Sequence, residues 1–81
     1  MTNLFPAASV AAKAHAELEY PNESVGIVTV SGEYVPLANI HPEPQSYFEI
    51  SDQDLAEYAG NIACVIHSHC YETGAVNPAF I

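Results

Sequence analysis

Two short apolar runs constrain the fold of this chain more than any other feature. Residues 24–30 (SVGIVTV) are β-branched and nearly continuous, which is typical of a strand buried on both faces. Residues 62–66 (IACVI) form the most apolar run of the chain and predict a central strand. Because the chain has only 81 residues, both strands are expected in one small domain.

A helix is expected before the first of these strands. Residues 7–20 are rich in alanine, the best helix former. Val10, Ala14 and Leu18 recur at intervals of four and predict the apolar stripe that packs on the core. Pro21 should end this helix, because proline disfavours helical geometry in the residue before it.

The middle of the chain predicts two further strands and a second helix. Residues 33–37 and 46–50 are the expected strands. Ser51 is a natural N-cap for the helix, with Asp54 three residues later near its positive end, and Gly60 is a natural C-cap.

The order of elements is helix, strand, strand, strand, helix, strand. It predicts an α/β or α+β fold with a mixed β-sheet and flanking helices. Residues 67–81 contain glycine and proline and are expected to form a loop.

Charge excludes two classes of partner. Ten aspartates and glutamates face one cation, Lys13, which gives a formal net charge of −9. Such a chain should repel nucleic acid and anionic membrane surfaces. No run approaches the roughly 20 apolar residues of a membrane span, and no targeting segment is visible, so synthesis in the cytoplasm is expected. The acidity serves solubility or favours basic partners and substrates.

A histidine pair follows the central strand directly. In an extended chain, His67 and His69 point to the same side, with Ser68 on the other. Zinc accepts neutral imidazole nitrogens, and α/β sheets place ligands at the ends of central strands. Alone, the pair is a weak signal and is more typical of two polar residues that cap a strand than of a metal site. Glu23, which opens the first buried strand, would alone be a solvated and inert carboxylate.

Together these residues resemble the JAMM (MPN+) zinc metallopeptidases. That family has a glutamate at its first strand, an H-[S/T]-H motif after a later strand, and then a serine and an aspartate downstream. Residues 14–23, 37–39 and 47–50 also look like the family's first helix and middle part. In detail the chain is similar to the phage branch, the N-terminal domain of lambdoid tail assembly proteins that also carry an NlpC/P60 peptidase domain.

The resemblance implies a layered architecture shared with cytidine deaminases, and a specific chemistry. His67 and His69 would bind Zn²⁺, and Glu23 would be the general base that activates a water on the metal to hydrolyse a peptide or isopeptide bond. Ser68 would have no catalytic role. The implied partners are a peptide or isopeptide substrate, other phage tail proteins and an NlpC/P60 domain, with synthesis in a bacterial host and a place in the virion tail.

The chain departs from the family pattern after the histidine pair. The serine and aspartate positions fall on Asn77 and Phe80, and phenylalanine cannot bind zinc. Residues 1–81 are therefore expected to be a partial domain, incomplete at the C-terminus, with the third ligand beyond Ile81. Two alternatives stay open: a catalytically inactive assembly module, and Glu72 as a substitute ligand. Cys70 is discounted as a ligand, because in an extended chain it points to the side opposite His69.

Several other residues receive structural interpretations. The Ser51-x-x-Asp54 spacing is explained by helix capping. His15 is expected to pack, His41 to be solvated, and Cys64 to be a small core residue. A zinc nucleobase deaminase is excluded, because that chemistry requires His-x-Glu and Pro-Cys-x-x-Cys motifs.

Overall fold

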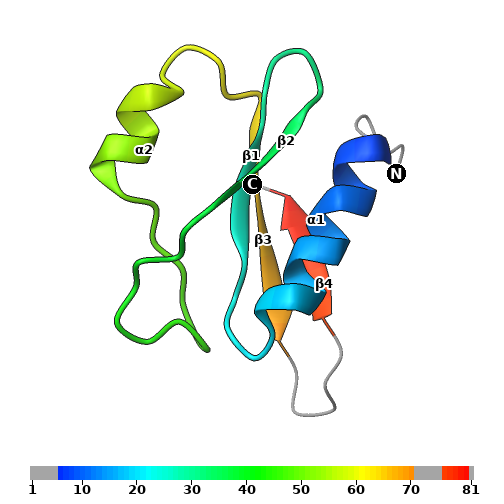
Figure 1. The fold of residues 1–81 in the computed structure, drawn as a ribbon, viewed down its shortest axis with the longest axis vertical. Helices are drawn as coiled ribbons and strands as arrows, with labels where there is room; N and C mark the ends of the chain where they lie inside the picture. Colours follow the sequence, from blue (N-terminus) through cyan, green and yellow to red (C-terminus); the bar gives the residue numbers. More distant parts are fainter. Residues whose placement is uncertain (1–5, 71–75, 81) are drawn as a thin grey trace.

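The computed structural model describes residues 6–70 and 76–80. Four strands form one sheet in the order β2-β1-β3-β4 (Figure 1). Their bounds are Val25–Val28 for β1, Tyr34–Leu37 for β2, Cys64–Cys70 for β3 and Val76–Phe80 for β4. The two apolar runs that predicted buried strands therefore lie side by side as β1 and β3, in the middle of the sheet.

All strand pairs in the described part of the chain are antiparallel, whereas a mixed sheet was expected. The connection from β2 to β3 passes through the second helix and returns in the same direction, as in a parallel crossover. However, β1 lies between these two strands, so they do not pair with each other. The α+β fold class is confirmed, with one helix packed on an antiparallel sheet.

Helix α1, Pro6–Glu19, lies against one face of the sheet (Figure 1). Ala8 and Ala12 of the helix join Val28 of β1 and Ile66 of β3 in the buried hydrophobic cluster. The helix ends just before Tyr20, as the following proline predicted.

The predicted apolar stripe of α1 is wrong. Val10 and Leu18 are 72% and 81% exposed, whereas Ala8, Ala12 and Ala16 are at most 2% exposed. Both rows repeat every four residues, so periodicity alone does not choose between them. The structure buries the smaller row, because methyl side chains let the helix backbone lie close to the sheet.

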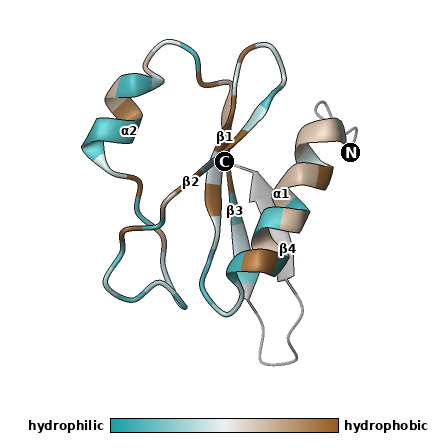
Figure 2. Cartoon of the chain, in the orientation of Figure 1, coloured by the Kyte–Doolittle hydropathy of each residue, from teal (hydrophilic) through white to brown (hydrophobic). Residues whose placement is uncertain are grey.

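Helix α2, Asp52–Glu57, begins as predicted, with the Ser51 side chain accepting a hydrogen bond from the Asp54 backbone N–H at 3.1 Å. Its C-cap is Tyr58 rather than Gly60, which adopts a positive φ of 81° two residues later. The helix buries none of its residues and is mostly hydrophilic (Figure 2). It therefore does not flank the core as expected.

Residues 46–50 do not form the predicted strand. The Ser46 and Tyr47 backbone N–H groups both donate to the Glu43 carbonyl at 3.1 Å, which makes a turn. The Ile40 N–H donates to the Glu49 carbonyl at 3.0 Å. These local bonds close residues 40–49 into a loop, called the Phe48 loop below.

Residues 67–81 were predicted to form a loop, but much of this segment is β-strand. β3 continues through the histidine pair to Cys70, and β4 pairs with it, so that His69 lies opposite Asn77 in the ladder. The neighbouring strand satisfies backbone groups that a solvated loop would expose. Pro78 fits β4 because this strand is at the edge of the sheet. Glu72 and Ile81 lie outside the described residues. Among the described helices, none is long and apolar enough to cross a membrane.

Candidate metal and acid–base site

The alternation of side chains along β3 places the two histidines on the sheet face opposite α1. Ile66 belongs to the cluster under α1, and Ser68 is fully buried with its Oγ accepting from the Ser24 N–H at 2.7 Å. His67 and His69 alternate with these residues and so share the other face. Their ring centroids are 4.8 Å apart, edge to face at 67°. The two imidazoles are therefore neighbours on this face, and their convergence on one metal ion stays a prediction.

Glu23 meets the histidine pair from the start of β1. Val25 lies opposite His67 in the ladder between β1 and β3. The two residues before Val25, Glu23 and Ser24, therefore lie next to the segment of β3 that carries the histidines. Glu23 is only 8% exposed, and its Oε1 lies 3.6 Å from His67 Nδ1. This distance is longer than a hydrogen bond. The acid therefore lies beside His67, one of the two histidines.

His67 Nδ1 is buried and has no hydrogen-bond partner among residues 6–70 and 76–80. Burying a ring nitrogen without a hydrogen bond costs free energy. The nitrogen is therefore expected to bind a ligand or a water, or to bond the facing carboxylate after a small shift. Two imidazoles and a nearby carboxylate are also a donor set that zinc accepts. The residues present thus fit a zinc ion in type. Within the described ranges, however, no three His, Cys, Asp or Glu side chains are grouped to hold a metal.

The Glu23 carboxylate can serve this site in two ways. If it accepts a hydrogen from His67 Nδ1, it fixes the tautomer and leaves Nε2 free to bind a metal. If it faces a water instead, it can remove a proton from that water. The 3.6 Å separation is compatible with both roles after a small movement.

Phe48 stacks on the ring of His67. The two rings are stacked, with centroids 4.5 Å apart and planes inclined by 25°. This contact limits rotation of the imidazole about its side-chain bonds. The sequence did not indicate it, because Phe48 had been placed in a strand rather than in a loop that returns to the sheet.

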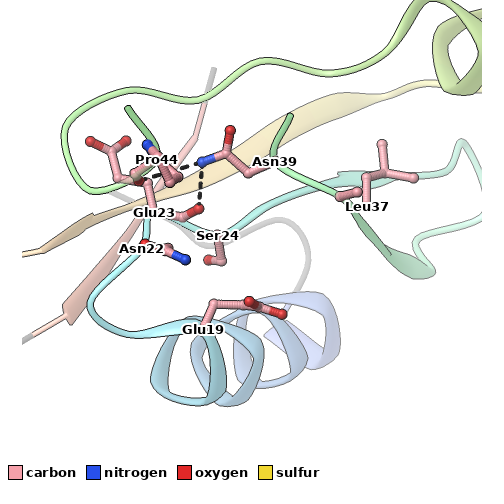
Figure 3. A pocket seen from close by; sticks show the side chains of 8 residues that line it. Glu19, Asn22, Glu23, Ser24, Leu37, Asn39 and Pro44 are labelled. Carbon is pink, nitrogen blue, oxygen red and sulfur yellow. Dashed lines mark hydrogen bonds between the residues drawn. The ribbon is translucent and has the colours of Figure 1, made fainter. Parts of the chain in front are cut away.

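Asn39 ties the Phe48 loop to Glu23. Its Nδ2 donates to the Glu23 carbonyl at 2.9 Å (Figure 3) and to the Tyr47 carbonyl at 3.0 Å. Its Oδ1 accepts from the N–H groups of His41 at 3.1 Å and Glu49 at 3.0 Å. The sequence signal was an asparagine at the entry to a proline-containing loop, where its side chain commonly bonds to backbone.

A hollow of about 250 Å³ lies beside this junction, between the end of α1 and the start of the Phe48 loop (Figure 3). It is lined by Glu19, Asn22, Glu23, Ser24, Leu37, Ala38, Asn39 and Pro44. Its volume is below the roughly 300–1,000 Å³ of small-molecule sites, so it suits one side chain rather than a whole substrate.

The remaining predicted residues lie outside the site. His15 packs as expected, with Nδ1 2.7 Å from the Tyr34 hydroxyl. His41 is not simply solvated, because its Nδ1 accepts from the Glu43 N–H at 2.9 Å. Cys64 is half-buried against the core cluster, and burial raises the pKa of its thiol.

Comparisons with known proteins give one similarity. No protein-family model and no solved structure matches the chain. Among curated proteins, the tail tip assembly protein K of Escherichia phage N15 is 38% identical over 61 residues, a match that covers 69% of this chain and 25% of that protein. The match thus spans about a quarter of the relative's length. The chain shows distant, partial homology to a phage tail tip assembly protein.

Proposed function

We propose that this chain provides the Glu23, His67 and His69 side chains of a zinc-dependent peptidase or isopeptidase site in a phage tail protein. The proposal rests on one observation: the buried His67 Nδ1, which has no hydrogen-bond partner in the described part of the chain, lies 3.6 Å from a buried carboxylate and beside a second imidazole. Separate strands supply the acid and the histidines, so local sequence alone does not explain their proximity.

Each side chain has a distinct role in this proposal. His67 and His69 would hold the zinc ion. Bound zinc would lower the pKa of water towards 7 and polarise the substrate carbonyl. Glu23 would accept the proton of the attacking water and later deliver it to the leaving amine. Ser68 takes no part in the chemistry, because its hydroxyl is bonded to Ser24 on the other face.

The substrate class and partners follow from charge and similarity. A net charge of −9 favours a basic peptide or an isopeptide substrate over an acidic one. The printed name of the phage N15 relative supports a place among tail proteins. An NlpC/P60 domain is the further partner that we propose, with synthesis in the bacterial host and incorporation into the virion tail.

Zinc binding tests the proposal directly. Purified full-length tail protein, made free of metal, would be titrated with Zn²⁺ by calorimetry and its bound metal measured after dialysis. We expect one zinc per chain, and its loss in His67→Ala and in His69→Ala. His15→Ala is the matched control, because the Nδ1 of that histidine contacts the Tyr34 hydroxyl outside the site. Wild-type protein without bound metal under zinc-replete conditions would refute the proposal.

Glu23→Gln separates the two roles of the carboxylate. If Glu23 is the general base, the Glu23→Gln variant should retain zinc and lose peptide hydrolysis. As the residue that orients His67, its replacement should weaken zinc binding by about 10–100-fold, the usual cost of losing such a partner. Our proposal expects the first outcome, and the second assigns Glu23 an orienting role instead.

A second candidate is a catalytically inactive module for tail assembly. It is favoured by the absence of a three-residue metal-binding group from the part of the chain that the structure describes. This alternative predicts that phage carrying His67→Ala in the tail protein assemble and infect normally. Loss of infectivity in both single histidine variants would exclude it.

A further inference from the structure

We propose that Asn39 is a positioning residue, which holds Glu23 and Phe48 in place beside His67. The inference deepens the proposed function and rests on it, since it assigns the support of the same site. It stands on a set of hydrogen bonds that converge on one amide side chain.

The partners of Asn39 frame Phe48. Nδ2 donates to the carbonyl of Tyr47 and Oδ1 accepts from the N–H of Glu49, so the backbone is held immediately before and after Phe48. One amide therefore fixes both peptide neighbours of the ring that stacks on His67 at 4.5 Å. The Phe48 loop has no helix or strand of its own to set this position.

The Asn39 side chain also holds the backbone of Glu23. Asn39 Nδ2 also donates to the Glu23 carbonyl at 2.9 Å, and the Glu23 N–H donates to the Pro44 carbonyl of the Phe48 loop at 2.7 Å. The backbone of Glu23 is thus held on both sides by Asn39 and the loop that it organises. Small errors in the position of a supporting group are costly for metal and acid–base sites.

An amide matches this set of partners, because the bonds require two donor hydrogens and an acceptor oxygen on one side chain. Asn39→Asp keeps an acceptor for Glu49 but turns an oxygen towards the carbonyls of Glu23 and Tyr47. Asn39→Ala removes all of these bonds. Asn61→Ala is the matched control, since Asn61 Oδ1 accepts from the Val30 N–H at 3.2 Å. That bond is exposed and involves none of the site residues.

The first measurement uses zinc-free, isotope-labelled protein. Amide hydrogen exchange at Glu23 reports its bond to the loop, and the ring-proton shifts of His67 report stacking by Phe48. We expect Asn39→Ala and Asn39→Asp to lower the protection of Glu23 about 10-fold and to move the His67 signals towards unstacked values. Phe48→Leu should move the His67 signals while the Glu23 amide stays protected. Asn61→Ala should change neither.

The second measurement is zinc affinity of the same folded variants. We expect Asn39→Asp to weaken zinc binding about 10-fold or more, as loss of a supporting contact does, and Asn61→Ala to leave it unchanged. Unchanged His67 signals and zinc affinity in Asn39→Asp would overturn this inference and leave the proposed function standing. Absence of zinc binding by wild type would refute the proposed function, and the zinc-free measurement would still decide whether Asn39 positions Glu23 and Phe48. Should Asn39→Ala not fold, Asn39→Asp carries both tests.

Discussion

Ser24 and Ser68 exchange two hydrogen bonds between the start of β1 and the middle of the histidine pair. The Ser24 N–H donates to Ser68 Oγ at 2.7 Å, and the Ser68 N–H donates to the Ser24 carbonyl at 3.0 Å. Ser68 is fully buried, and its neighbours on either side are the two histidines. The bonded pair therefore fixes the backbone that carries the acid relative to the backbone that carries both imidazoles.

We expect Ser68→Ala to lower the free energy of unfolding by about 1–3 kcal/mol, because it leaves the buried Ser24 N–H without this acceptor. Urea denaturation measures the change. Ser46→Ala is the matched control at an exposed turn and should stay within about 0.5 kcal/mol of wild type. Equal stability of the two variants would show that the Ser68 hydroxyl does not matter to the fold.

The sequence predicted where the main elements lie but not which face of α1 is buried. Apolar runs and an alanine-rich segment are local signals, and they correctly indicated β1, β3 and α1. One row of α1 begins at Val10 and the other at Ala8, each repeating every four residues. Which row is buried depends on how close the helix axis comes to the sheet. That distance is a tertiary property, and hydrophobicity favoured the wrong, larger row.

A pair of alanine substitutions tests this packing. Ala12→Leu places a large side chain where α1 contacts Val28 and Ile66 and should destabilise the protein by about 1–3 kcal/mol. Ala14→Leu introduces the same side chain at an exposed position of the same helix and should change stability by less than about 0.5 kcal/mol. Thermal unfolding compares them, and a larger loss for Ala14→Leu would contradict the observed helix face.

The candidate site was predictable only in part. A family pattern singled out Glu23 and the histidine pair, because those residues lie at the ends of recognisable strands, and the structure has Glu23 beside His67 and His67 beside His69. Asn39 and Phe48 were not recognised as part of it. Their place depends on polar contacts between a loop and a strand start, which have no periodic signature. Zinc binding itself stays a prediction.

Gly26 lies beneath the ring of Tyr34, and a Cβ at Gly26 would overlap the Tyr34 ring and hydroxyl. We expect Gly26→Ala to cost about 1–3 kcal/mol, since the ring must move. In Tyr34→Ala the space is free, so adding Gly26→Ala should then cost much less. A double-mutant cycle by urea denaturation measures this coupling, and strictly additive effects would contradict the contact.

Tyr34 should also make stability depend on alkaline pH. Burial, assisted by the negative charge of Glu19, raises the pKa of Tyr34 from 10.0 to about 12. Below pH 10 the phenol is neutral in both the folded and the unfolded chain, so the contribution of Tyr34 to stability is fully present. As pH rises from 10 to about 12, the unfolded chain releases the phenol proton before the folded chain does, so stability falls. The hydroxyl also lies 2.7 Å from His15 Nδ1, an interaction that ionisation would alter.

Urea denaturation at a series of alkaline pH values, with ultraviolet titration of the tyrosinates, measures this effect. Tyr34→Phe should remove both the late tyrosinate step and its share of the stability loss between pH 10 and 12. Glu19→Gln should keep the step but lower its midpoint slightly, because burial is the larger cause of the raised pKa. If the late tyrosinate step persists in Tyr34→Phe, it belongs to one of the other four of the chain's five tyrosines. The Tyr34 phenol over Gly26 would then have no such effect on stability.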